Sequence, residues 1–383
     1  MNVAPPSRRE LGAVLMLALA ARAAALLLLP DPHLHDAEVY AEAGRRLLTD
    51  GMLPVHNCMP LVPLLSGLTG GGPWTRLLDV LLSVATVGVV VRLGWQLFAD
   101  RRAALLAGVI AALWPHLVVA SVLRLTETSF AFLFCLGLSL WLGRRWVAGS
   151  LAMSLGVLAR PTFELLLPAL LIGVAVGFHR RTWRDAVRPL AVLLAVYAVT
   201  MSPWWAHNLV AYGQFVRLHT GGGLVAYVGH HPDNVEGGGL ASAPPLDLSP
   251  WLAIDDPIER DHALQRAAAG FVTDDPVRAA RRCVTRVMRL WRPWPNTEEV
   301  RSPAVLAVWG ATFLPLVCLA VVHLARHTRR VRRSALLLWL PVAYLTAIHA
   351  LTLASVRYRL PVEPLLILLA AHAAAMALPT RDR

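Results

Sequence analysis

The stretch LGAVLMLALAARAAALLLL at residues 11–29, followed closely by HDAEVY at 35–40, decides the fold of this chain. Arg22 is the one ionisable side chain in the apolar stretch. A bilayer core requires about 20 apolar residues for each helical span. The sequence therefore predicts a first transmembrane helix, with acidic residues at the membrane surface directly after it. Because Arg22 interrupts the stretch and no clean small-residue cleavage site follows, we expect this span to be uncleaved.

The composition of the whole chain also indicates a membrane protein. Of its 383 residues, 56% are hydrophobic and 16% are charged, and the mean hydropathy is +0.55. Soluble domains contain roughly 25% charged residues. Apolar segments recur and predict an all-α polytopic membrane protein of about ten spans. These are expected at 11–30, 76–98, 103–120, 125–143, 146–159, 162–178, 189–205, 302–325, 335–353 and 361–378.

The basic residues, all of them arginine, predict the orientation of these spans. A net charge of +12 would suggest nucleic acid binding in a soluble protein. Here the arginines lie in loops between spans, so no nucleic acid partner is expected. Six arginine-containing segments fall on one side: Arg8/Arg9, Arg101/Arg102, Arg144/Arg145, 179–188, Arg326–Arg333 and the C-terminal tail. The positive-inside rule makes this side the cytoplasm of a plasma (inner) membrane, with both termini cytoplasmic.

This topology divides the chain into three parts. Residues 1–205 form an N-terminal transmembrane module whose first outer loop is 31–75, 206–301 form a large extracytoplasmic loop, and 302–383 contain the C-terminal spans. The four cysteines have neither the pattern of a disulfide framework nor the spacing of a zinc site. They are Cys58, Cys135, Cys283 and Cys318.

Two segments outside the spans have the periodicity of amphipathic helices, 36–48 and 276–291. Asp275 followed by Pro276 is a favourable start for the second helix, an N-cap before a proline at the first position. Its apolar face and its arginine-rich face suit the membrane interface. The arginines could contact either an anionic lipid headgroup or solvent.

The acidic residues Asp36 and Glu38 are the first candidates for chemistry. A carboxylate at a membrane surface can serve as a general base. Asp36 could instead cap the helix that begins there, and Glu38 in the first turn would suit the helix dipole.

A second set of candidates consists of arginines beside apolar spans: Arg124, Arg160, Arg357 and Arg359. An arginine at this depth normally has a partner or binds an anion, and its planar fork suits phosphate. The alternative is that the side chain extends to the interface. Arg124 and Glu127, three residues apart, are expected to pair if they share one helical face.

Two further patterns are weaker. The string HHPDN contains His230, His231 and Asp233, which could bind metal, but no other ligand lies at a set spacing. Glu363 lies inside the last span, where a carboxylate suggests a function by default. It could equally pair with Arg359 one turn earlier.

Six strings, in order along the chain, resemble the GT-C membrane glycosyltransferases, in particular protein O-mannosyltransferases and aminoarabinose transferases of lipid A. They are HDAEVYAEAGRRLLTDG (35–51), MPLVPLLSGL (59–68), LTETSFAFLF (125–134), LARPTFELLLPAL (158–170), PWWAHNLVAYGQFV (203–216) and RYRLPVEPLLILLA (357–370). Two features depart from these relatives. Ala37 separates the two acids, which are usually adjacent, and His207 stands where relatives often have arginine before asparagine.

The resemblance implies an inverting transferase that takes a sugar from a polyprenyl-phosphate donor at the outer face of the membrane. The acceptor would be a hydroxyl of a glycan, a lipid or a protein. It implies Asp36 as the base with Glu38 in support, arginines that hold the lipid phosphate, and a divalent cation as an open alternative. The residues expected to bind substrate are His35, Tyr40, Arg124, Glu127, Arg160, His207, Asn208, Arg357, Tyr358 and Arg359.

Two other functions stay open. A transporter or flippase of lipid-linked sugars would also contain intramembrane charges, although transporters of this kind usually show paired repeats and none is visible. The other alternative is a non-catalytic GT-C scaffold.

Overall fold

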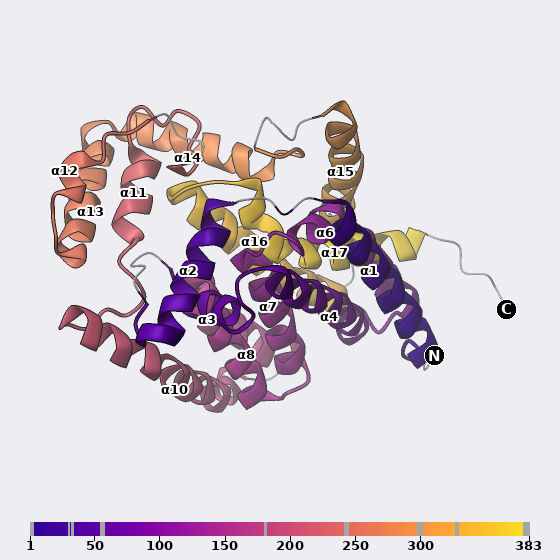
Figure 1. Cartoon of the computed structure of the whole chain (residues 1–383). Helices are drawn as coiled ribbons and strands as arrows, with labels where there is room; N and C mark the ends of the chain where they lie inside the picture. The colour runs from indigo at the N-terminus through magenta and orange to yellow at the C-terminus, as the bar shows by residue number, and fades with distance from the viewer. Residues whose placement is uncertain are drawn as a thin grey trace.

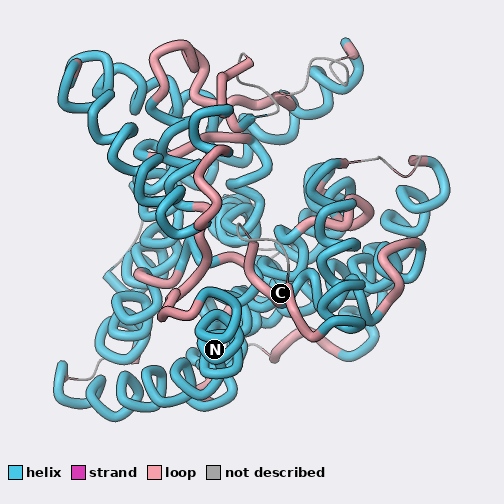
Figure 2. The backbone as a smooth tube through the Cα atoms, turned by 60° about the vertical axis from the view of Figure 1, so that its left-hand side comes forward, coloured by secondary structure: helices cyan, strands magenta, loops and turns pink. Residues whose placement is uncertain are grey.

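The computed structural model describes residues 4–29, 31, 34–53, 58–179, 182–240, 245–296, 302–325 and 329–377. Within these residues the chain forms helices and connecting loops and no strand (Figure 2). The predicted all-α fold is confirmed. Of the predicted arginine cluster at 326–333, residues 326–328 lie outside the described residues, as do the side chains of 329–333.

Among the described residues, six helical segments are long and apolar enough to cross a membrane. They are α1 (Arg8–Leu28), α4 (Pro73–Phe98), η3 with α10 (Trp183–Ala186 and Val187–Tyr212), α15 (Pro303–Ala325), α16 (Arg329–Leu351) and η6 with α17 (Val356–Val362 and Glu363–Ala377). Shorter apolar helices lie between them: α7 (Thr126–Leu142), α8 (Trp146–Ala159), and η1, α9 and η2 (Pro161–Phe163, Leu166–Ile172 and Gly173–Phe178). The chain is an integral membrane protein, and the number of about ten spans stays a prediction.

The span predicted at 103–120 is broken into two helices, α5 (Arg101–Leu113) and α6 (Pro115–Ala120). Pro115 has no N–H to continue the first helix, and the residue before a proline avoids helical dihedrals. The fully buried Arg22 guanidinium donates to the carbonyl oxygens of Ala111 and Ala112, at 3.2 and 2.7 Å. The arginine of the first span thus satisfies the backbone that the break exposes.

The helix predicted at 36–48 is α2 (His35–Asp50), which crosses α3 (Leu61–Leu68) at close range. A Cβ added to Gly44 would lie 2.0 Å from the carbonyl oxygen of Pro63, and one added to Gly67 would lie 2.5 Å from that of Gly44. Only glycine permits this approach of the two backbones. The crossing fixes the direction of α2 and hence of its first turn.

Four more helices lie at the same end of the bundle: α11 (Gly222–His230), α12 (Ser249–Leu252), α13 (Pro257–Asp274) and α14 (Pro276–Trp291). In Figure 1, α11, α12 and α13 gather at the upper left and α14 crosses the top of the molecule, away from the beginning of α1. We call this the loop end. The predicted start of α14 is confirmed, since Asp275 Oδ1 accepts the backbone N–H of Arg278 at 2.8 Å.

The two faces of α14 are arranged as in an interfacial helix rather than a solvated one. Val277, Val284 and Met288 are 59%, 61% and 69% exposed, whereas Arg286 and Arg289 are buried. The apolar face thus points out of the protein, and much of the arginine face points into it. A merely solvated basic face, one of the two sequence interpretations, does not describe these two arginines.

Candidate active site

The first turn of α2 holds Asp36 and Glu38 on different sides of the helix, because residues two apart do not face each other. Asp36 Oδ2 accepts a hydrogen bond from Arg357 at 2.5 Å. Glu38 Oε1 lies 3.5 Å from Arg124. The helix N-cap is Leu34, so Asp36 does not cap it. Asp36 and Glu38 therefore belong to two separate ion pairs, each with a different arginine.

Glu127 connects the first of these pairs to the core of the bundle. Its carboxylate is 3% exposed, and Oε1 lies 2.5 Å from Arg160 and 3.5 Å from Arg357 Nε. Arg160 is the residue directly after α8, and Arg357 belongs to the tight helix η6. Arg357 thus bridges Asp36 and Glu127, and joins three segments that are far apart in the sequence.

We call Asp36, Glu127, Arg160 and Arg357, together with Glu38 and Arg124, the charged cluster. Arg124 in this cluster has partners of its own. Its guanidinium binds Asp31 Oδ1 at 3.0 Å and the carbonyl oxygen of Gly71 at 2.6 Å. Arg124 has φ 57°, a strained conformation for a non-glycine residue, in the turn before α7. The expected pairing of Arg124 with Glu127 is wrong. Because Arg124 lies outside the helix, the three-residue spacing does not place the two side chains together.

Two tyrosines line this group of charges. The Tyr358 ring lies 5.1 Å from the Arg160 guanidinium and 5.3 Å from that of Arg357, and it stacks on His349 at 4.8 Å. Tyr40 is one turn after Asp36. Burial, reinforced by the charges of Asp36 and Glu127, raises the pKa of the Tyr40 phenol. Tyr40 is therefore a neutral hydrogen-bond donor at neutral pH.

Two solved structures resemble this chain over almost its whole length. One is ArnT from Cupriavidus metallidurans bound to undecaprenyl phosphate, with 18% identity, a TM-score of 0.58, and coverage of 95% of this chain and 60% of that one. The other is the Archaeoglobus fulgidus oligosaccharyltransferase tethered with an acceptor peptide containing the NVT sequon, with 14% identity, a TM-score of 0.58, and coverage of 97% and 50%. Both are GT-C membrane glycosyltransferases. This chain has the GT-C fold.

The similarity concerns the fold, since both identities are low. The chain covers 60% and 50% of the lengths of these two proteins. No family model and no characterised protein matches the sequence.

Four residues expected to bind substrate in the GT-C fold lie apart from the cluster, namely His35, His207, Asn208 and Arg359. His35 is exposed at the start of α2. His207 Nε2 accepts the backbone N–H of Leu53 at 3.0 Å, which ties α10 to the segment that follows α2. Asn208 donates to the carbonyl oxygens of Val216 and Leu218. Both residues of α10 thus organise loops.

Arg359 binds one carboxylate and two backbone carbonyl oxygens, and these contacts hold helices together. Its Nε lies 2.9 Å from Glu363, so the expected pair is confirmed, and Nη1 donates to the carbonyl oxygens of Leu290 and Arg292. Glu363 also accepts from Trp114 at 2.6 Å and lies 2.7 Å from His116 Nδ1. Arg359 is thus committed to holding α14, α17 and the broken α5–α6 segment together.

Sequence reasoning missed Asp31 and Asp79. Asp79 is buried in α4, close enough to Glu127 and Arg124 to interact with both electrostatically. The rule that singled out Glu363, a carboxylate inside a span, applies equally to Asp79 and could have found it. Asp31 gave no signal, because its contact with Arg124 depends on how the loop turns after α1.

A metal site requires several histidine, cysteine or carboxylate side chains in one place. Within the described ranges, no group of three or more histidine, cysteine, aspartate or glutamate side chains is placed to hold an ion. In the HHPDN string, His230 Nε2 lies 3.0 Å from the carbonyl oxygen of Leu351, and His231 lies 3.7 Å from Asp233.

Proposed function

We propose that this protein is an inverting glycosyltransferase that moves a sugar from a polyprenyl-phosphate donor to an acceptor hydroxyl. The observation that supports this most strongly is the bridge from Asp36 through Arg357 to Glu127. It joins a partly exposed carboxylate to guanidinium groups at the loop end of a membrane-spanning GT-C fold. The undecaprenyl phosphate in the similar ArnT structure corresponds to the lipid phosphate that such a donor releases.

The arginines of the cluster would hold the donor phosphate. A lipid phosphate is a stable leaving group, so the reaction needs cations in place rather than a strong general acid. Arg160 and Arg357 place two guanidinium groups at Glu127, and Arg124 places a third beside Glu38. Arg357 is about one third exposed, so a phosphate can reach it and compete with Asp36 for its N–H groups.

Asp36 would act as the base. The acceptor oxygen attacks the anomeric carbon, the bond to the phosphate oxygen breaks, and the hydroxyl proton passes to the Asp36 carboxylate. A single displacement inverts the configuration of the sugar carbon. Glu38, held near Arg124, would support the acceptor side, and the neutral Tyr40 phenol can donate a hydrogen bond beside Asp36.

The reaction would take place outside the cytoplasm of a plasma (inner) membrane. The arginines in the loops opposite the loop end predict that side to be cytoplasmic, with both termini on it. A polyprenyl chain would then lie in the bilayer while its phosphate reaches the cluster. The acceptor hydroxyl would belong to a glycan, a lipid or a protein.

The experiment compares two isosteric variants in one helix. Asp36→Asn and Glu42→Gln are reconstituted in proteoliposomes with a polyprenyl-phosphate sugar, and release of the sugar is measured. Loss of a general base lowers the rate by about 10²–10⁴-fold, so we expect that loss for Asp36→Asn. Glu42 pairs on the surface with Arg45 and Arg46, and its variant should keep the wild-type rate.

Two results would count against the proposal. If folded Asp36→Asn releases sugar at the wild-type rate, Asp36 is not the base. If the wild type carries the intact lipid-linked sugar across the membrane without cleaving it, the protein is a transporter and not a transferase.

A further inference from the structure

One face of α14 combines exposed apolar side chains with one exposed arginine. Val277, Arg281, Val284 and Met288 follow one another at spacings of four, three and four residues, so they form a single stripe along the helix. All four are exposed. An arginine within an outward-facing apolar stripe of a membrane protein suits the depth at which lipid headgroups begin.

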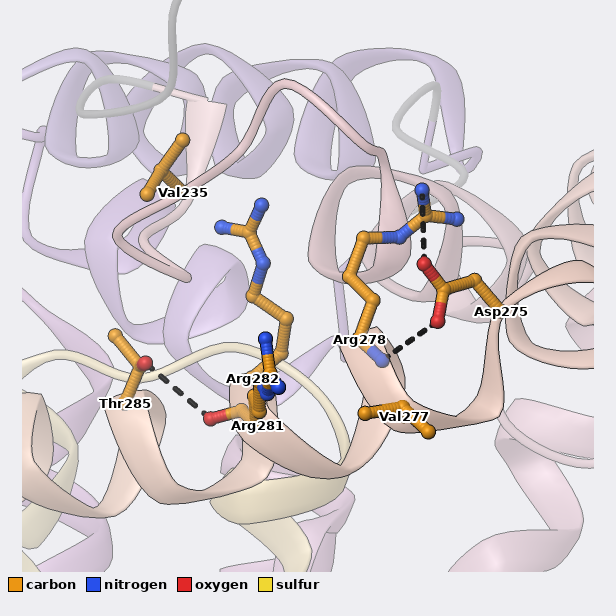
Figure 3. A pocket seen from close by; sticks show the side chains of 7 residues that line it. All are labelled: Val235, Asp275, Val277, Arg278, Arg281, Arg282 and Thr285. Carbon is orange, nitrogen blue, oxygen red and sulfur yellow. Dashed lines mark hydrogen bonds and ion pairs between the residues drawn. The ribbon is translucent and has the colours of Figure 1, made fainter.

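Beside this stripe lies a groove of about 500 Å³ lined by charged residues of α14. Figure 3 shows Arg282 extending from the helix towards Val235 and Arg278 turned towards Asp275, with Arg281 seen nearly end-on at the base of Arg282. Asp275 is the one acidic residue that lines the groove, against three arginines. The groove therefore attracts anions.

The three arginines differ in how much of their hydrogen-bonding capacity the protein uses. Arg282 donates to the carbonyl oxygens of Pro232 and Asn234, at 2.8 and 2.5 Å. Arg278 donates to the carbonyl oxygen of Phe271 and lies 3.8 Å from Asp275. For the Arg281 guanidinium, no partner is found in the described part of the chain. Arg281 is thus available to an external anion, and Arg278 can assist it.

A second groove, of about 470 Å³, lies between α14 and α16, where Val287 and Trp291 flank the exposed stripe on the side opposite Arg278 and Arg282. Its lining is almost entirely apolar: Val287, Trp291, Trp339, Val342, Ala343, Thr346, Ala347 and Ala350. From Trp339 to Ala350 it follows about 16 Å of a helix that is long and apolar enough to span the membrane. The groove is therefore continuous with a surface that faces lipid tails.

We propose that α14 binds an anionic phospholipid of the bilayer leaflet at the loop end. The lipid phosphate is held by Arg281 with help from Arg278, and an acyl chain lies in the groove between α14 and α16. A net positive groove on one flank of the exposed stripe and an apolar groove on its other flank match the two parts of such a lipid, and each arginine near an anionic headgroup contributes about 1 kcal/mol. None of these arginines belongs to the proposed catalytic cluster, so the site does not depend on the proposed function.

The bound lipid would brace the segment that contains Arg357. Arg289 of α14 donates to the carbonyl oxygen of Ala354 at 3.1 Å, and Arg359 donates to the end of α14 at Leu290. These bonds join α14 to η6 on both sides of Arg357. Fixing α14 on the membrane therefore also fixes the position of η6.

The test measures lipid retention and needs no activity assay. The full chain in detergent is mixed with phosphatidylglycerol or phosphatidylcholine of equal chain length, and bound lipids are counted by native mass spectrometry. We expect wild type to retain phosphatidylglycerol in preference to phosphatidylcholine. Arg281→Gln should weaken this retention about fivefold. The control Arg266→Gln removes an exposed arginine from α13 and should retain lipid like wild type.

A second variant tests the apolar half of the site. Ala347 is exposed and lines the groove, so Ala347→Phe fills the space proposed for the acyl chain and should also lower phosphatidylglycerol retention. Equal retention by Arg281→Gln and wild type would overturn the proposal, as would equal retention of the two lipids. Stabilisation by inorganic phosphate to the same extent as by phosphatidylglycerol would show a site for a free anion instead.

Discussion

Six buried or partly buried arginines of the described residues differ in their main partners: three donate to backbone carbonyls at helix ends, although Arg359 among them also pairs with Glu363, and three lie beside carboxylates. Arg22 donates to the end of α5, Arg286 to the ends of α11 and α16, and Arg359 to the end of α14. Arg160 and Arg357 instead meet at Glu127, and Arg124 meets Asp31 and Glu38.

The difference supports a proposal about which arginines can take part in chemistry. The last carbonyls of a helix have no partner within it and bear the negative end of the helix dipole, so a guanidinium there completes the fold. Removing it leaves buried acceptors unsatisfied. At a partly open site, a phosphate can instead replace the carboxylate partner of an arginine. Its oxygens bind the planar guanidinium group as the carboxylate oxygens do.

The largest expected effect is a loss of sugar release when an arginine bound to carboxylates is replaced. Arg357→Gln removes the cation that bridges Asp36 and Glu127, and loss of one preorganised charge at a developing anion lowers the rate by about 10²–10³-fold. The melting temperature should change little, since Glu127 keeps Arg160. Sugar release and thermal unfolding in the same detergent measure both quantities. A folded variant that keeps the wild-type rate would remove Arg357 from the site.

The second effect concerns stability. Arg286→Met leaves the carbonyl oxygens of Gly229 and Ala350 without their donor, and each buried unsatisfied group costs about 1–3 kcal/mol. We expect a clear loss of unfolding free energy, with sugar release per folded molecule affected far less than in Arg357→Gln. An Arg286→Met protein as stable as wild type, but inactive, would reverse the assignment of the two groups.

A third variant shifts the helix that carries Asp36 without changing any charge. In Gly44→Ala the new methyl group meets the backbone of α3, and such overpacking costs about 1–3 kcal/mol. The displacement of α2 shifts Asp36, so sugar release should fall together with stability. Gly12→Ala is the matched control, because nothing lies within 4 Å of the added methyl group. If the two variants behave alike, the close crossing of α2 and α3 does not position the site.

The smallest effect is expected from a surface arginine. Arg45 pairs with Glu42 at 2.7 Å, and both side chains are largely exposed. Exposed pairs contribute little because water and salt screen them. Arg45→Gln should therefore leave both the melting temperature and sugar release unchanged. A measurable loss of activity would extend the functional surface along α2, beyond the first turn.

Much of the architecture was predictable from local patterns. The long apolar segments, the amphipathic helix at 276–291 and its Asp275 cap depend on hydropathy, periodicity and capping, which act over a few residues. The break at Pro115 was missed, although the proline is visible in the sequence. An apolar window does not distinguish one helix from two when a buried arginine from another span satisfies the break.

The candidate site was predictable in its residue types but not in its pairing. Asp36, Glu127, Arg160 and Arg357 were all expected, whereas the expected pair of Arg124 with Glu127 was wrong. Pairing rules based on spacing hold only within one helix. The ion pairs here join residues up to 321 positions apart.

The sequence by itself determined that this chain is an all-α membrane protein, where its longest helices lie, and which charged residues lie beside apolar spans. Hydrophobic burial and capping are local, so they can be read without knowing the fold. Only the tertiary structure decided that Asp36 and Glu38 face different arginines, and that Arg359 holds helices while Arg357 bridges two acids. Those outcomes depend on how helices distant in the sequence cross, and the close approach at Gly44 sets the crossing for α2.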